Sequence, residues 1–424
     1  MGTAGGGTRK RWAWRVRATM VAASTMLAAT LAGLSPAEAV VVANQIQVPA
    51  GVATVQGAID AAAPGDTVVV AAGTYHEHLD FEGKAIEVRS SAGPASTTID
   101  GDGVSHVVRF HTNEGRASVL RGFTITHGLA AVTIVGGGVS IEFASPTIVD
   151  NVITANDGAS HDGGGIGSVG GSPLIQGNHV LGNHNVPAGA GGGIFAVGAG
   201  VVIGNLIEDN SAGGGGGALL GDQTVFTDNV VRGNQALAYD GGGVSIGDGT
   251  PLVIQNLITA NSAEVRGGGI FWRSTGAATQ RRIVGNTVVG NQAPNGSAIA
   301  GESNGATLVD NVVVGAGASS TVECLGTAIP LTTFDHDDVF GGTPLYAGCA
   351  DPTGADGNTS ADPKFVAGTG PAPDYHLQPG SPSIDAGDSA AAAFDADIDG
   401  LPRITDGDGD GSAVVDMGAY EAPA

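Results

Sequence analysis

The chain has 424 residues and carries 41 acidic against 17 basic side chains, which gives a net charge of −24 with neutral histidines. Such a charge repels nucleic acid and anionic membrane surfaces, so we expect neither as a partner. It would also repel an acidic polysaccharide unless a divalent cation bridged the two, although an acidic surface is ordinary for the solubility of an exported protein.

Residues 1–39 have the pattern of a secretory signal peptide. A segment with five Lys and Arg residues precedes an apolar run from Met20 to Leu34, and Ala37-Glu38-Ala39 offers a cleavage site of small residues. The apolar run is about 15 residues long, short of the roughly 20 that a membrane-spanning helix needs, and no later segment is a better candidate. We therefore predict cleavage after Ala39, an extracellular location, and a mature monomer without a transmembrane segment.

The segment Thr54–Ala63 predicts a short amphipathic helix. Four apolar residues recur there at helical spacing: Val55, Ala58, Ile59 and Ala62. Thr54 is placed to cap the first turn, and Pro64-Gly65 is placed to end the helix before a strand at 67–70. Because an array of repeats needs its end covered, we expect this helix to close the N-terminal end of the repeats that follow.

A repeated unit occupies residues 120–320. Its clearest form is NVITAN at 151–156, which returns six more times at steps of 24 to 30 residues. The first residues of the copies are Asn151, Asn178, Asn205, Asn229, Asn256, Asn286 and Asn311. The residue two places after each Asn is Ile or Val, the residue three places before it is apolar, and a Gly-Gly-Gly run keeps the same period. A period of this length indicates a solenoid, a propeller or another array.

The content of the unit predicts a right-handed parallel β-helix over residues 40–333. Each unit holds short β-branched runs broken by Gly, Asn and Pro, with no segment long enough for a helix, so helical repeats are excluded. A propeller blade needs roughly 40 residues, more than one unit supplies. Three short strands joined by tight turns fit the unit, with apolar side chains inward and the Asn side chains in a hydrogen-bonded ladder at a turn.

Residues 55–75 (VQGAIDAAAPGDTVVVAAGTY) resemble the opening of many secreted β-helix proteins of the pectate-lyase-like class. The resemblance implies the parallel β-helix but carries little information on activity, since this fold hosts many functions. Motifs typical of three kinds of enzyme with this fold are absent from the sequence: the NTD and RIK motifs of polygalacturonases, the paired-arginine signature of pectate lyases, and the DPHE motif of alginate epimerases.

Residues 334–424 differ in character from the repeats. They contain FDHDDVFG, SADPKFV, DYHLQPGSPSIDAGD, DIDGLPR and VDMGAYE, which together are similar to a closing domain of secreted bacterial β-helix proteins, named for the choice of cell-surface anchors that can follow it. We expect this segment to form an irregular, acidic C-terminal cap. Four residues follow Tyr420 without a sorting motif or an apolar tail, so we expect a freely secreted protein. Cys324 and Cys349 are expected to form a disulfide, as such pairs do in exported proteins.

Alternating carboxylates in a glycine-rich loop predict a structural Ca²⁺ site near the C-terminus. Asp406, Asp408 and Asp410 stand two apart with glycines between them, and Asp416 follows. Oxygen ligands at such spacing can converge on one hard cation, although the twelfth position of the loop holds Met417 where an EF-hand has Glu. A solvated acidic turn is the alternative interpretation.

Residues next to the triple glycines predict a carbohydrate site. The candidates are His161, Asp162, Tyr239, Asp240, Arg266, Trp272 and Arg273. Equivalent positions in successive coils line one face of a β-helix, so Tyr239, Asp240 and Arg266 should be neighbours. Trp272 beside charged groups could stack on a sugar ring. The alternative is that these are ordinary turn residues with an ion pair between coils.

Together these observations predict an extracellular protein that binds carbohydrate or a surface partner along its ladder face. One alternative is a Ca²⁺-assisted polysaccharide lyase or a related enzyme on acidic glycans, which would need a base and a cation at the reacting centre. Another is a structural, adhesin-like protein. His76 with His78, and His179 with His184, could serve a mechanism, but histidine pairs on turns are usually solvated, so the sequence assigns no catalytic residue.

Overall fold

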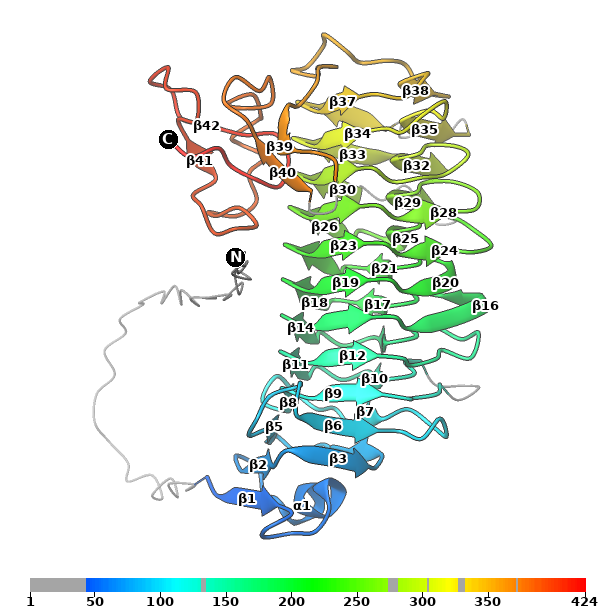
Figure 1. The fold of residues 1–424 in the computed structure, drawn as a ribbon, viewed down its shortest axis with the longest axis vertical. Helices are drawn as coiled ribbons and strands as arrows, with labels where there is room; N and C mark the ends of the chain where they lie inside the picture. Colours follow the sequence, from blue (N-terminus) through cyan, green and yellow to red (C-terminus); the bar gives the residue numbers. More distant parts are fainter. Residues whose placement is uncertain (1–42, 131–134, 274–280, 303–304, 327–331, 371–372) are drawn as a thin grey trace, which may run out of the picture. The chain divides into compact units, whose positions relative to one another are not determined.

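The computed structural model describes residues 43–130, 135–273, 281–302, 305–326, 332–370 and 373–424, which form a parallel β-helix (Figure 1). The predicted fold class is therefore confirmed. The predicted signal peptide lies outside the described residues. No helix among the residues that are described is long and apolar enough to cross a membrane.

Three parallel sheets, here called A, B and C, form the walls of the helix, and successive coils add one strand to each. Sheet A comprises β1 (Gln45–Val48), β2 (Thr67–Val70), β5 (Glu87–Ser90), β8 (Val119–Arg121), β11 (Thr147–Val149), β14 (Leu174–Gln176), β18 (Val201–Ile203), β22 (Val225–Thr227), β26 (Leu252–Ile254), β30 (Arg281–Val284), β33 (Ala306–Val309) and β36 (Thr333–Asp335). Sheet B comprises β3 (Gly73–His76), β6 (Thr97–Asp100), β9 (Thr124–Thr126), β12 (Val152–Thr154), β15 (His179–Leu181), β19 (Leu206–Glu208), β23 (Val230–Arg232), β27 (Leu257–Thr259), β31 (Thr287–Val289), β34 (Val312–Val314) and β37 (Asp338–Phe340). Sheet C comprises β4 (Leu79–Asp80), β7 (Val108–Phe110), β10 (Val139–Glu142), β13 (Ile166–Val169), β17 (Ile194–Gly198), β21 (Ala218–Asp222), β25 (Val244–Gly249), β29 (Ile270–Arg273), β32 (Ile299–Glu302), β35 (Val322–Leu325) and β38 (Tyr346–Ala347).

Smaller sheets flank these walls. Sheet D widens the middle coils between sheets B and C and comprises β16 (His184–Ala190), β20 (Ser211–Gly214), β24 (Gln235–Ala236) and β28 (Ser262–Ala263). Two antiparallel pairs follow near the C-terminus: β39 (Phe365–Ala367) with β40 (Asp374–Leu377), and β41 (Ile404–Thr405) with β42 (Val414–Val415).

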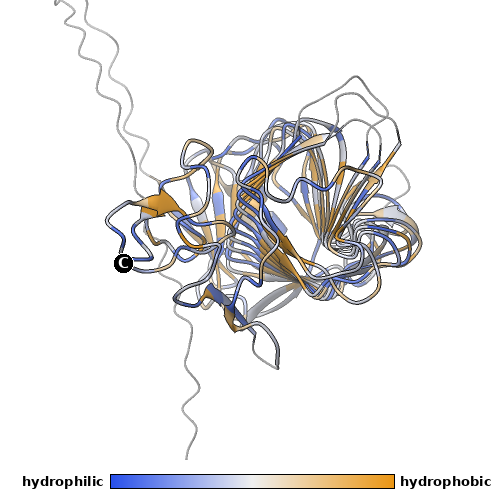
Figure 2. Ribbon diagram, turned by 90° about the horizontal axis from the view of Figure 1, so that it is seen from above, coloured by the Kyte–Doolittle hydropathy of each residue, from blue (hydrophilic) through white to orange (hydrophobic). Residues whose placement is uncertain are grey.

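The repeating apolar residues fill the interior of the helix. Ile148 in sheet A pairs in register with Ile175 of the next coil, and Ile153 in sheet B pairs with Val180. All four side chains are fully buried. In a three-residue strand the middle side chain points to one face and its neighbours to the other, so every coil adds one inward residue per short strand. Figure 2 shows the coils superposed along the axis, with hydrophobic residues recurring at the same places.

The predicted Asn ladder is present. The Asn151 backbone N–H and side-chain Nδ2 both donate to Oδ1 of Asn178, at 3.0 and 3.1 Å, and the same pattern recurs in the later coils. A second ladder follows sheet B, where Asn156 donates in the same way to Oδ1 of Asn183. Both ladders are buried. Each Asn therefore satisfies the backbone of its own turn and of the neighbouring coil.

The predicted helix closes the N-terminal end of the coils. Helix α1 spans Val55–Ala61, and the Thr54 hydroxyl accepts a hydrogen bond from the Gly57 N–H at 3.1 Å. Its apolar face packs into the interior, because Val55 and Ile59 are fully buried. In Figure 1 the helix lies at the blue end of the stack.

The parallel ladder continues beyond the predicted boundary at residue 333. Strands β36, β37 and β38 add a further coil, and Cys324 of β35 forms a disulfide with Cys349 just after β38. The predicted disulfide is therefore confirmed. The disulfide links β35 to the chain that follows β38, the last strand of sheet C.

Residues 365–370 and 373–424 form an irregular segment that lies beside the last coils and not over their end (Figures 1 and 2). We call it the lateral segment. Tyr375 shares a hydrogen bond of 2.9 Å with Thr259 of β27, and the Ala419 N–H donates to the Thr287 hydroxyl of β31. Gln255, after β26, donates to the Ala396 carbonyl. The lateral segment therefore covers sheets A and B of these coils, and none of these contacts between described residues involves sheet C.

Candidate functional site

Five charged residues gather on the outer face of sheet C in the last coils. We call them the carboxylate–arginine cluster: Asp240, Arg266, Arg273, Glu302 and Glu323. The strand register places Arg273 of β29 beside Glu302 of β32, and Glu323 of β35 lies next to Ala300 of β32. Because alternate residues of a strand face outward, the sheet holds these side chains on one surface.

The triple-glycine runs bring Asp240 and Arg266 to this face. Gly241 and Gly267 adopt left-handed backbone conformations, with φ of 75° and 60°, so the chain reverses immediately after each charged residue. The Gly241 N–H donates to the Arg266 carbonyl at 3.0 Å, which fixes the spacing of the two turns. A Cβ atom at Gly267 would lie 2.4 Å from the Ile270 carbonyl oxygen, so the turn can lie against the sheet only because this residue is glycine.

Glu302 is the centre of the ion pairs. Its Oε2 lies 3.0 Å from Arg266 Nη1 and 3.9 Å from Arg273 Nε. Arg273 is 60% exposed, whereas Arg266 and Glu302 are about half as exposed. The Arg273 guanidinium therefore keeps most of its donors available to solvent or to a ligand.

Two carboxyl groups of the cluster are shielded from solvent. Asp240 Oδ1 and Glu323 Oε2 are buried, and neither has a hydrogen-bond partner among the described residues. Burial raises the pKa of Asp240, and Glu302 raises it further against the opposing effect of Arg266 and Arg273. Burial also raises the pKa of Glu323, against the lowering effect of Arg266 and with a smaller raising effect of Asp240. A carboxyl with a raised pKa can hold a proton and donate a hydrogen bond to an oxygen.

An open groove of about 570 Å³ lies on the same coils. It is lined by Glu264, two residues before Arg266, and by Ser297, which directly follows Gly296. The backbone of Arg266 pairs with Asn295, so the groove and the cluster share two adjacent turns. The volume is within the range of small-ligand sites, about 300–1,000 Å³.

Two of the predicted aromatic residues have opposite environments. Tyr239 is 55% exposed beside Asp240, where its ring is available for stacking. Trp272 is 1% exposed and points into the core, so its predicted role as a surface platform is wrong. The physical reason is strand alternation, because Trp272 has the same parity as the inward Ile270.

His161 and Asp162 do not join the cluster. They precede β13, whereas Asp240 precedes β25, three rungs further along sheet C. At about 4.8 Å per rung the separation is about 14 Å. The His161 ring contacts the Ala159 carbonyl at 3.0 Å, and burial raises the pKa of Asp162.

Sequence reasoning found Asp240, Arg266 and Arg273 but missed both glutamates. Glu302 follows Ile299 by three residues, as Arg273 follows Ile270, so an alignment of the C strands would have paired them. Glu323 follows Val322 as Phe271 follows Ile270, which marks it as outward-facing. The repeat pattern therefore contained the signal for both residues.

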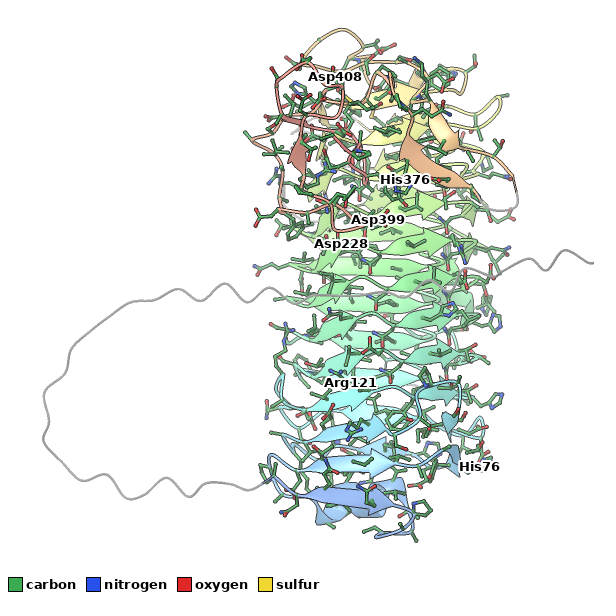
Figure 3. All side chains as sticks on the ribbon, turned by 60° about the vertical axis from the view of Figure 1, so that its left-hand side comes forward. His76, Arg121, Asp228, His376, Asp399 and Asp408 are labelled. Carbon is green, nitrogen blue, oxygen red and sulfur yellow. A yellow bond between two sulfur atoms is a disulfide. The ribbon has the colours of Figure 1, made fainter. Side chains whose placement is uncertain are left out.

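The acidic loop of the lateral segment brings together a different set of carboxylates from the predicted one. Asp385, Asp406 and Asp408 each offer an oxygen within 4.8 Å of the others, and Figure 3 shows Asp408 at the outside of the segment. Asp410 is exposed and accepts the Ser412 N–H. The structure therefore groups the carboxylates of Asp406 and Asp408 with that of Asp385, and the Asp410 carboxylate is outside this group of described residues.

Asp416 also lies apart from this loop. It is fully buried, and its two oxygens accept the N–H groups of Asp385 and Ala422 at 2.7 and 2.6 Å. The Asp416 carboxylate therefore links two parts of the lateral segment, at Asp385 and at Ala422. The prediction that Asp416 contributes a cation ligand is not supported by this arrangement.

No protein-family model matches the sequence, and no curated protein matches it. Among solved structures, the chain is similar to pectate lyase Pel9A, with a TM-score of 0.42 and 13% identity over 86% of this chain and 90% of that one. It is also similar to the A-module of the mannuronan C-5 epimerase AlgE6 of Azotobacter vinelandii, with a TM-score of 0.40 and 16% identity over 73% of this chain and 94% of that one.

Proposed function

We propose that the protein is an extracellular carbohydrate-binding protein, and that the carboxylate–arginine cluster binds an acidic polysaccharide. The observation that carries the proposal is the combination of an exposed arginine, Arg273, with two shielded carboxyl oxygens that lack partners among the described residues. Guanidinium groups bind carboxylates through paired hydrogen bonds. Carboxyl groups bind sugar hydroxyls, and the exposed ring of Tyr239 can stack on a sugar face.

The charge of the whole protein makes such a cluster necessary. The predicted mature chain keeps 12 of the 17 basic residues and 40 of the 41 acidic ones, since residues 1–39 hold five basic residues and Glu38. A uronate polymer would be repelled by most of this surface. The exposed guanidinium of Arg273 provides the hydrogen-bond donors that would hold a uronate carboxylate against the repulsion.

A lyase acting on acidic glycans is the second candidate function. Abstraction of the proton next to a uronate carboxylate needs a base and a cation that holds the developing charge. Arg266 and Arg273 lie beside Asp240 and Glu323, whose raised pKa values are typical of groups that exchange protons in active sites. The acidic loop is part of the lateral segment over sheets A and B, so we propose that a Ca²⁺ ion there is structural and not part of this chemistry.

Gel retardation tests the binding proposal. The purified protein is run in native gels with polygalacturonate, alginate or a neutral glucan, and we expect the two uronate polymers alone to slow it. Arg266→Ala and Arg273→Ala should abolish the retardation. Arg121→Ala is the matched control, because Arg121 is 48% exposed and ion-paired on sheet A, away from the cluster. Unchanged retardation of the cluster variants would contradict the proposal.

The same samples separate binding from catalysis. Ultraviolet absorbance of the polymer solutions reports the unsaturated products of a lyase. We expect a flat trace for a binding protein and a rising trace for a lyase. A rising trace that persists in Asp240→Asn and Glu323→Gln would place the chemistry elsewhere on the molecule.

A further inference from the structure

Three side chains converge at the N-terminal end of sheet B, far from the carboxylate–arginine cluster, and a fourth, that of His127, contacts one of the three. They are His76 at the end of β3, Asp100 at the end of β6, Asp102 two residues later, and His127 directly after β9. Strands β3, β6 and β9 are neighbours, and the register aligns His76 with Asp100 and Asp100 with Thr126. Three successive coils therefore present these groups at one edge.

The contacts between the four groups are short. His76 Nδ1 lies 2.7 Å from Asp102 Oδ1, and His127 Nδ1 lies 3.0 Å from both oxygens of Asp100. One ligand atom each of His76, Asp100 and Asp102 lies within 4.8 Å of the other two. Each imidazole has a second ring nitrogen, so the set offers two nitrogen and two carboxylate donors.

The backbone holds the two turn residues in place. Asp102 and His127 have left-handed φ values of 53° and 52°, and the Asp102 N–H donates to Asp100 Oδ1 at 2.9 Å. These conformations direct both side chains to the edge of sheet B. Figure 3 shows His76 at the outside of the lower coils, where solvent has access.

The ion pairs leave this group with a surplus of negative charge when the histidines are neutral. Asp100 pairs with His127, and Asp102 pairs with His76; neither pairs with a lysine or an arginine in the part of the chain that the structure describes. Asp100 is also the least exposed of the four, at 14%, against 58% for each histidine. A divalent cation would neutralise both carboxylates, which the histidines alone do only when protonated.

We propose that His76, Asp100, Asp102 and His127 form a Zn²⁺ site. Mixed imidazole and carboxylate ligands in a set of four match the tetrahedral preference of Zn²⁺, whereas Ca²⁺ takes six to eight oxygens. The exposed histidines can rotate to reach the metal–ligand distance of about 2.0–2.1 Å. Such an ion links three coils of the N-terminal end.

Calorimetric titration tests the site directly. The protein is prepared without a polyhistidine tag, treated with a chelator, and titrated with ZnCl₂ and, separately, with CaCl₂. We expect one Zn²⁺ per chain with an affinity that falls about tenfold or more in His76→Ala and in His127→Ala. CaCl₂ should not compete for the same site.

His111→Ala is the matched control. His111 also contacts an aspartate, Asp80, at 2.8 Å on a neighbouring coil, but no second carboxylate joins them in the described metal-ligand groups. This variant should keep the wild-type Zn²⁺ affinity. Circular dichroism of all variants checks that the fold is intact, as expected for substitutions of exposed side chains.

Cobalt spectroscopy provides a second measurement. Four-coordinate Co²⁺ with these ligands gives a visible absorption band that is much stronger than that of the hydrated ion, and we expect it in the wild type and not in His76→Ala. Absence of Zn²⁺ binding in the wild type would overturn the proposal and leave two solvated histidine–aspartate pairs. An unchanged affinity in folded His76→Ala and His127→Ala would overturn it equally.

Discussion

Gly301 lies directly against the indole of Trp272 inside the β-helix. A Cβ atom at Gly301 would lie 1.9 Å from Trp272 Cε2, and Trp272 is 1% exposed. The neighbouring rungs fix both strands, so neither residue can move away easily. We expect Gly301→Ala to lower the free energy of unfolding by about 1–3 kcal/mol through overpacking, measured by urea denaturation.

Gly247→Ala is the control for this substitution. Gly247 lies in β25 of the same sheet, and its nearest contact for an added Cβ is an ordinary 3.5 Å. Its effect should be small. Equal unfolding midpoints for the two variants would show that the packing of the Trp272 indole does not require glycine at position 301.

Asn229 occupies the middle of the first Asn ladder. Its Nδ2 donates to Asn256 Oδ1 and to the Val202 carbonyl, and its Oδ1 accepts the Asn205 N–H at 2.9 Å. Asn229→Ala leaves several of these buried groups unpaired, at about 1–3 kcal/mol for each. We expect a loss of about 3 kcal/mol or more in the free energy of unfolding, whereas Asn295→Ala, at an exposed Asn with one long contact of 3.3 Å, should cost little.

Asp310 predicts a dependence of stability on pH. Its carboxyl is fully buried under the lateral segment, where burial raises the pKa to about 7 from 3.8. The folded protein therefore holds a proton between about pH 4 and pH 7 that the unfolded chain releases, so stability falls as the pH rises through this window. We expect a lower unfolding midpoint at neutral pH than at mildly acidic pH, measured in urea.

Asp310→Asn tests the assignment. Asparagine keeps an oxygen that can accept the Asp388 N–H, as Asp310 Oδ1 does at 2.6 Å, but it carries no proton to lose. The variant should show a flatter pH dependence between about pH 4 and pH 7 than the wild type. An unchanged slope would assign the effect to other buried carboxyls, such as Asp416, whose pKa burial raises to about 6.

The acidic loop predicts stabilisation by Ca²⁺. If Asp385, Asp406 and Asp408 hold the ion in the folded state only, Ca²⁺ at one hundred times its dissociation constant adds about 2.7 kcal/mol to the stability. Differential scanning calorimetry should show that CaCl₂ raises the melting temperature of the wild type and leaves that of Asp408→Asn unchanged. Asp410→Asn, in the same loop but outside the group, should keep the rise in melting temperature with CaCl₂. Loss of this rise would show that Asp410 is a ligand, as the sequence predicts.

The fold could be predicted because the repeat constrains every coil in the same way. Positions such as Ile148 and Asn151 recur with fixed spacing, and only a stack of parallel coils gives all copies one environment. The lateral segment has no such repetition. Its contacts, for example Thr259 with Tyr375 across 116 positions of the chain, depend on residues that share no period, so the sequence does not indicate which face it covers.

The candidate site could be predicted in part for a related reason. The glycine runs align Asp240 with Arg266, and this alignment depends only on the period. The direction of a side chain depends instead on its parity within the strand, and this parity turns Trp272 inward and Glu302 outward. His76 and Asp100 precede the repeated unit that begins at residue 120, so no aligned copy marks them as neighbours of each other or of His127.

The position of the lateral segment has a mechanical consequence. A simple solenoid unravels from its end, one coil after another, because each coil contacts only its neighbours. Here Ala419 and Tyr375 form hydrogen bonds with β31 and β27, which are two and three strands before β37, the last strand of sheet B. A force applied to the C-terminus would therefore load these rungs together and in parallel, so we expect the terminal coils to resist peeling until the lateral segment has detached as a unit.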